Sequence, residues 1–126
     1  MGTQQGVVSW FCCGPLGYPG ACGAAGNGAC GDCNSESYQC AWQYLTGYPS
    51  QYCGQGAPES CGSALSIAAP CYSTGVAVNV ADHGPGACSG QTQCYPLSNR
   101  IIDLTPAAFV NLAPLDYGLI TGFVQL

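Results

Sequence analysis

Eleven cysteines among 126 residues constrain this chain more than any other feature of its sequence. This density is typical of small domains held together by disulfides, which persist in oxidising compartments. Eight of the cysteines fall between Cys12 and Cys61, in a stretch rich in glycine. Such a stretch predicts loops pinned by bridges rather than regular elements. We therefore expect a secreted, extracellular protein, whose signal peptide is already removed because residues 1–10 lack a basic and an apolar region.

The cysteine pattern also carries expectations about pairing. The count is odd, so at least one cysteine is free, pairs with another chain or has lost its partner. Cys12 and Cys13 are adjacent and should pair with different partners, because a vicinal bridge strains the backbone. The spacing Cys30-Gly-Asp-Cys33 also occurs in metal and redox sites, but the chain has one histidine and no second pair of this kind. We expect bridges there, with no metal and no cofactor.

The charge of the chain excludes several partners. Charged residues make up only 6% of it, with a single Lys or Arg and a net charge of -5. Binding to nucleic acid or to an anionic membrane surface requires clustered basic residues, so neither is expected. No apolar run is long enough to span a membrane. A surface with few charges and many Tyr, Ser, Gln and Asn side chains favours a neutral, hydroxyl-rich partner such as a glycan.

Hydrophobic periodicity predicts a mostly β chain. Strands are expected at 6–11, 64–68, 76–81 and 119–126, the last broken by Gly122. One short helix is expected at about 105–113, with Thr105 as its cap and Pro106 in its first position. Its buried face carries Phe109, Leu112 and Ala113, and Pro114 ends it. The whole of 1–126 is predicted to form one domain, a small barrel or sandwich.

Four segments resemble the double-psi β-barrel family, which includes expansins, loosenins, rare-lipoprotein-A domains, barwin-like proteins and family-45 endoglucanases. They are GVVSWF at 6–11, a GACG at 20–23 or 28–31, the run from Cys61-Gly62 to GVAVNVADHGPG at 75–86, and IDLTPAAFVNLAPLDYG at 102–118. The fourth is the most specific, whereas residues 32–60 match no segment of the family. The resemblance implies a six-stranded double-psi β-barrel with one short helix and long disulfide-pinned loops.

The resemblance also implies site residues. Asp103 stands where endoglucanases and expansins of this fold keep their acid, and Asp82 where expansins keep a second aspartate in the groove. Ser9 takes the place of a threonine that positions the acid. The residues themselves leave other roles open. Asp82 begins the turn-forming run DHGPG, and the carboxylate of Asp103 could interact favourably with the N-terminal end of the following helix dipole.

Two positions depart from the family pattern. The sequence from Trp10 to Pro15 resembles the opening of family-45 endoglucanases, but Phe11 stands where those enzymes keep the aspartate base. Inverting hydrolysis needs both an acid and a base, so cleavage by the usual mechanism is weakened. Arg100 and Ile101 stand where lytic members of the family commonly carry a histidine. The expected sugar-stacking residues are Trp10, Tyr18, Trp42 and Tyr95, although aromatic side chains also serve as core residues.

The leading hypothesis is therefore an expansin-like or loosenin-like domain that binds and loosens cell-wall polysaccharide such as glucan, chitin or peptidoglycan. One alternative is a glycoside hydrolase or lytic transglycosylase with Asp103 as general acid. Another is a protein-binding module, because this fold includes secreted inhibitors of cysteine proteases. A monomer is expected, with self-assembly through an unpaired cysteine as the structural alternative.

Overall fold

The computed structural model of this protein describes residues 2–47, 57–84 and 100–125. Tyr95, one of the predicted sugar-binding residues, lies outside the described residues, as do Cys53, Cys88 and Cys94.

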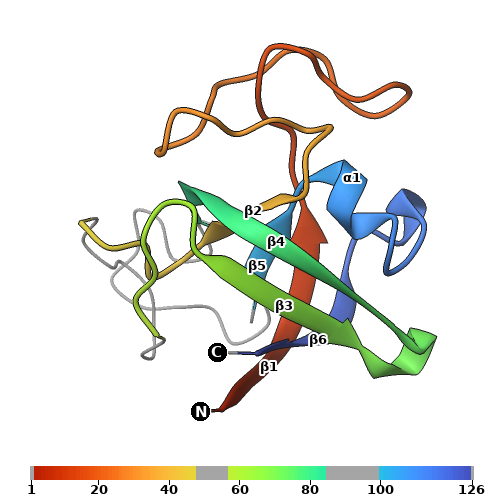
Figure 1. Cartoon of the computed structure of the whole chain (residues 1–126). Helices are drawn as coiled ribbons and strands as arrows, with labels where there is room; N and C mark the ends of the chain where they lie inside the picture. The colour runs from red at the N-terminus through yellow and green to blue at the C-terminus, as the bar shows by residue number, and fades with distance from the viewer. Residues whose placement is uncertain (1, 48–56, 85–99, 126) are drawn as a thin grey trace, which may run out of the picture.

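Six strands close into a barrel in the order β1-β5-β2-β4-β3-β6 (Figure 1). The strands are β1 (Thr3–Trp10), β2 (Gln39–Trp42), β3 (Ala64–Ala69), β4 (Thr74–His83), β5 (Arg100–Leu104) and β6 (Ile120–Gln125). β1 pairs in parallel with β5, and β2 pairs in parallel with β4, while the remaining pairs are antiparallel. The predicted fold class, a mostly β six-stranded barrel with little helix, is confirmed.

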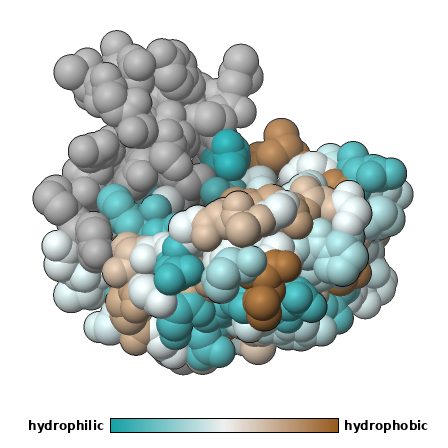
Figure 2. Space-filling model, turned by 90° about the horizontal axis from the view of Figure 1, so that it is seen from above, coloured by the Kyte–Doolittle hydropathy of each residue, from teal (hydrophilic) through white to brown (hydrophobic). Residues whose placement is uncertain are grey.

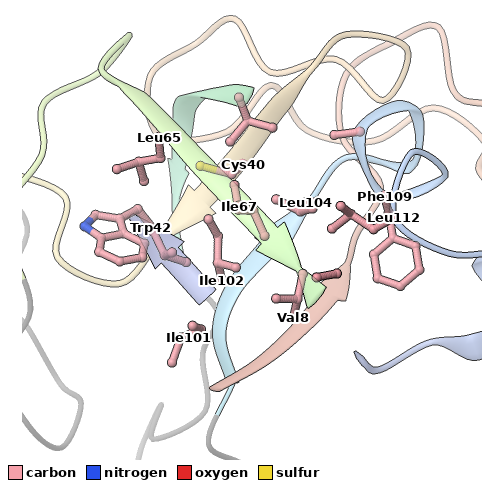
Figure 3. Close-up of a cluster of buried hydrophobic side chains, with 14 of the residues drawn as sticks. Val8, Cys40, Trp42, Leu65, Ile67, Ile101, Ile102, Leu104, Phe109 and Leu112 are labelled. Carbon is pink, nitrogen blue, oxygen red and sulfur yellow. The ribbon is translucent and has the colours of Figure 1, made fainter. Parts of the chain in front are cut away.

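The barrel is filled by side chains that alternate along its strands, which is the pattern expected when one face of each strand is buried. Leu65 and Ile67 of β3 lie in the core with Val78 and Val80 of β4. Figure 3 shows how buried side chains from several strands, Trp42 among them, meet inside the barrel. The burial of these side chains supplies the main driving force for folding.

A break in the last strand was predicted at Gly122, but the strand continues through this residue. Gly122 pairs with Gly6 inside an uninterrupted β6, so the prediction of a break was wrong. A Cβ atom at position 122 would lie 2.9 Å from Cγ2 of Val8 and 3.1 Å from the carbonyl oxygen of Ala68. The glycine therefore allows β6 to approach its neighbours closely rather than ending it.

The predicted helix is present but short. α1 covers Pro106–Phe109, with Pro106 in its first turn as expected. Beyond it the backbone tightens into turns, in which the amide of Leu112 donates to the carbonyl of Phe109 at 2.8 Å. Two further turns of 3-10 helix are η1 (Pro70–Tyr72) and η3 (Leu115–Tyr117). The predicted buried face is confirmed, because Phe109, Leu112 and Ala113 all belong to the core.

Thr105 does not cap α1 through its side chain, contrary to the prediction. Its hydroxyl donates instead to the carbonyl of Ser37, and it accepts a hydrogen bond from the amide of Gln39 at 3.2 Å. Thr105 is fully buried. Its hydroxyl therefore ties the segment that enters β2 to the end of β5.

Among the described residues, three disulfides pin the segments on either side of β2. They join Cys12 to Cys22, Cys13 to Cys33, and Cys30 to Cys61. The prediction that Cys12 and Cys13 have different partners is confirmed. Two of the described cysteines are free, namely Cys40 in the core and Cys71 on the surface.

The segment between β1 and β2 lies over one end of the barrel, as the red-to-orange trace at the top of Figure 1 shows. All three bridges involve cysteines of this segment, and such bridges are consistent with a secreted protein. In the described part of the chain, no helix is both long enough and apolar enough to cross a membrane.

Candidate functional site

The barrel brings three predicted site residues into one row across four neighbouring strands. Ser9 of β1 is opposite Asp103 of β5, which is opposite Ala41 of β2, which is opposite Asp82 of β4. Neighbouring strands lie about 4.8 Å apart, so the backbones of Asp103 and Asp82 are separated by about 10 Å. Sequence reasoning placed these residues near one another only through the family resemblance.

Asp103 lies at the centre of a small polar cluster. Its neighbours in β5, Ile102 and Leu104, are core residues, so alternation directs Asp103 away from the barrel interior. Ser9 donates its hydroxyl proton to Oδ1 of Asp103. Arg100 completes the cluster, with Nη2 at 2.9 Å from the same Oδ1 and Nε donating to the hydroxyl of Ser9 at 3.1 Å.

Arg100 supplies the charge that this buried carboxylate needs. The side chain of Asp103 is 10% exposed and that of Arg100 is 37% exposed, so the pair lies at the boundary between core and solvent. A buried carboxylate is costly unless it is paired and hydrogen-bonded. The ion pair with Arg100 and the hydrogen bond from Ser9 satisfy both conditions.

Arg100 was not predicted as a site residue. Sequence reasoning noted it only as standing where a histidine is common. Residues three apart on a strand point to opposite faces, so the spacing of Arg100 and Asp103 gave no reason to expect a contact. The one usable signal was that Arg100 is the only Lys or Arg in the chain, and that Asp103 is the nearest acid along the sequence.

Asp82 makes hydrogen bonds of a structural kind. Its Oδ1 accepts from the amide of Ala29 and from the amide of His83, both at 2.8 Å. Carboxylates that bond nearby backbone amides in this way commonly stabilise turns and loops. Asp82 therefore holds the loop that contains Cys30 against the end of β4, where the amide of Cys30 donates to the carbonyl of Ala81.

The predicted aromatic residues differ in their availability. Trp42 is fully buried in the barrel core, and its indole nitrogen donates to the carbonyl of Ala57 at 2.9 Å. Its ring has no face toward solvent, so we remove it from the candidate sugar-binding residues. Trp10 is half-buried and donates to the carbonyl of Leu115. Tyr18 is half-buried in the loop between Cys12 and Cys22.

The position at which family-45 enzymes carry a base is apolar in the structure as well as in the sequence. Phe11 packs against a second, smaller core cluster formed by Cys13, Cys33 and Ala81. This cluster fastens the disulfide-pinned segment to the end of the barrel. The spacing from Cys30 to Cys33 is explained by two separate bridges, and the described residues hold no group of three or more His, Cys, Asp or Glu placed to bind a metal ion.

The most exposed large hydrophobic side chains of the described residues lie in two places, and Tyr38 and Val110 are exposed as well. Leu16, in the loop closed by Cys12 and Cys22, is 69% exposed. The second place is an aromatic patch made by Tyr72 of η1 and Tyr117 of η3, whose ring centroids are 5.9 Å apart, with Leu119 following. Figure 2 shows the molecule from above as a mosaic of hydrophilic and weakly hydrophobic residues with small strongly hydrophobic spots.

No protein-family profile matches the chain, and no curated protein matches its sequence. Among solved structures, it is similar to the Streptomyces papain inhibitor (SPI), with 22% sequence identity and a TM-score of 0.55. The match covers 98% of this chain and 91% of that one. At this identity the likeness shows the shared fold alone, and together with the closed six-stranded barrel it supports the predicted barrel fold.

Proposed function

We propose that this protein is a secreted inhibitor that binds papain-like cysteine proteases, rather than a wall-active domain. The observation that carries the proposal is the likeness to the Streptomyces papain inhibitor along almost the whole chain, including its disulfide-pinned segment. The exposed Leu16 and the aromatic patch are two alternative surfaces with apolar side chains of the kind that anchor protein–protein interfaces. This was an alternative at the sequence level, and it now ranks above the leading hypothesis.

The surroundings of Asp103 support this ranking. A general acid must donate a proton to the leaving oxygen, but Arg100 and Ser9 both use Asp103 as an acceptor. The equivalent of the base is Phe11, packed in an apolar cluster. Asp103 is therefore better explained as a buried anchor of β5 than as an acid aimed at a substrate.

The polysaccharide hypothesis keeps one favourable observation, the row that aligns Ser9, Asp103 and Asp82. Against it, Trp42 is withdrawn into the core, and both aspartates are engaged in hydrogen bonds within the protein. Co-sedimentation with insoluble glucan, chitin and peptidoglycan tests binding directly. Release of reducing sugar that disappears in Asp103→Asn would restore the hydrolase reading.

Inhibition is tested with papain that has been activated by a thiol and then separated from it, because residual thiol would reduce the disulfides of the inhibitor. The rate of hydrolysis of a fluorogenic peptide is measured against inhibitor concentration, with trypsin as a protease of a different class. We expect tight inhibition of papain, unchanged by Asp103→Asn, and none of trypsin. Full papain activity at micromolar inhibitor would refute the proposal.

A further inference from the structure

We infer that the loop closed by Cys12 and Cys22 is the segment that enters the substrate cleft of the protease, with Leu16 as its apolar anchor. This inference rests on the proposed function and assigns that function to named residues. Leu16 has the highest exposure among the large hydrophobic side chains of the described residues, at 69%. The free energy gained when a partner buries an apolar side chain rises with the area removed from water, so a leucine this exposed can contribute strongly to binding.

The loop is held rigid on both sides of Leu16. Before it, the amide of Gly14 donates to the carbonyl of Gly26, and the carbonyl of Gly14 accepts from Ala25, both at 2.8 Å. After it, Tyr18 and Cys22 exchange two backbone hydrogen bonds of 2.9 Å. The Cys12–Cys22 bridge then closes the loop covalently.

Gly17 makes this closure possible. Its backbone has a φ of +70°, and a Cβ atom there would lie 2.5 Å from the carbonyl oxygen of Cys22. Any other residue would force the two sides of the loop apart. Leu16 is therefore presented from a loop that loses little conformational entropy on binding, and such preorganisation strengthens protein–protein complexes.

Charge indicates the kind of cleft that fits the loop. The sequence carries no Asp, Glu, Lys or Arg before Asp32. Insertion of this loop therefore desolvates no charged side chain, which would be costly in an apolar pocket. We therefore assign the loop to the apolar substrate-binding pocket beside the catalytic cysteine of a papain-like protease, with Leu16 inserted into that pocket.

The aromatic patch is the competing surface, and the structure favours the loop over it. Tyr72 and Tyr117 pack edge to face on each other, so part of each ring is already removed from water. Their elements, η1 and η3, are joined by no disulfide of the described residues. The three side chains of the patch together expose more area than Leu16 alone, but the patch has no covalent closure that would hold it in one conformation.

Two matched substitutions separate the surfaces. Leu16→Asp and Leu119→Asp both place one negative charge on an exposed leucine, since Leu119 is 59% exposed beside Tyr117. Leu16→Asp should weaken inhibition of papain by about 30-fold or more, which corresponds to loss of a hot-spot residue. Leu119→Asp should change the inhibition constant by less than about twofold, within the usual neutral range of surface positions. Leu16→Met should retain most of the inhibition because it keeps an apolar side chain.

A hydrogen-exchange experiment on the wild-type complex gives a readout that needs no variant. Amides of residues 14–22 should exchange more slowly with papain bound, while those of 70–73 and 115–119 should be unchanged. If the wild type inhibits papain but Leu16→Asp inhibits equally well, or if protection appears only in the second region, the loop assignment is overturned while the proposed function stands. If the wild type itself fails to inhibit, the proposed function and this inference both fall.

Discussion

Arg100 and Asp103 form an ion pair of 2.9 Å although they stand only three residues apart on one strand. The register of β5 against β1 shifts just after Arg100, which interrupts the strict alternation of side chains. The long side chain of Arg100 reaches Oδ1 of Asp103, and its Nε contacts Ser9 of the neighbouring strand. The cluster thus joins the parallel strands β1 and β5 through side chains as well as through the backbone.

Substitution of Asp103 should therefore affect stability rather than inhibition. Asp103→Asn removes the charge that pairs with Arg100 but keeps an oxygen that accepts from Ser9. We expect a loss of about 1–2 kcal/mol in the free energy of unfolding, limited by solvent screening of the partly exposed arginine. Urea unfolding measures it. Asp116→Asn, at an exposed acid, should change the same quantity by less than about 0.5 kcal/mol. An equal effect of both substitutions would contradict the structural role of the pair.

Thr105 provides a second test, because its hydroxyl joins two segments instead of capping α1. Thr105→Val keeps the shape of the side chain but leaves the carbonyl of Ser37 and the amide of Gln39 without this buried partner. We expect a loss of about 1–3 kcal/mol in urea unfolding. Thr105→Asp would preserve a helix cap but bury a charge, so it should be the more destabilising of the two. A stable Thr105→Asp variant would show that the capping role was right after all.

The strands with clear alternation were predictable from sequence, because their periodicity records which face is buried. β3 and β4 were found in this way, and β1 and β6 were found with shifted ends, whereas no strand was predicted at β5. β2 was not found, since Gln39–Trp42 is only four residues long, contains Cys40 and has three consecutive buried residues. Only its pairing with β4 and β5 makes it a strand. The short α1 was overpredicted for a related reason, because an apolar face continues through Leu112 after the helical hydrogen bonds have ended.

The candidate site was predictable only where the sequence carried a family pattern. Ser9 and Asp103 are 94 residues apart, and their contact depends on the parallel pairing of β1 with β5. Composition and spacing contain no information on that pairing. Leu16 was overlooked because a single leucine in a glycine-rich loop has no periodicity, and its exposure depends on disulfide connectivity that spacing does not determine.

Removal of two of the disulfides should lower the free energy of unfolding by different amounts. Cys30–Cys61 spans 31 residues and Cys12–Cys22 spans 10. In the loop-entropy description, replacement of both cysteines by alanine should cost about 4 kcal/mol for the longer loop and about 3 kcal/mol for the shorter one. Urea unfolding of the two double variants gives the comparison.

Inhibition of papain should follow the opposite order if the loop assignment holds. Loss of Cys12–Cys22 frees the Leu16 loop and should weaken inhibition more, despite its smaller cost in stability. Loss of Cys30–Cys61 leaves that loop closed. Inhibition that simply follows the stability of the two variants would argue against a specific role for the loop.

The buried thiol of Cys40 should make the free energy of unfolding decrease at alkaline pH. Burial in the barrel core raises the pKa of its thiol far above the ordinary range, and the nearby charges of Asp103 and Glu59 raise it further. In the unfolded chain the thiol ionises from about pH 8.5 upward. The folded state then holds a proton that the unfolded state has lost, so the stability is fully present below that pH and falls as pH rises.

The expected slope is up to about 1.4 kcal/mol per pH unit, so Cys40 should cost about 2 kcal/mol between about pH 8 and about pH 10. The measurement compares urea unfolding of Cys71→Ser with that of Cys71→Ser/Cys40→Ala, so that the exposed thiol of Cys71 is absent from both proteins. Readings are taken faster than thiolate-driven disulfide exchange. All other ionisable groups are common to both variants, so their contributions cancel in the difference. Parallel pH profiles would mean that the Cys40 thiol ionises as readily in the folded protein as in the unfolded chain.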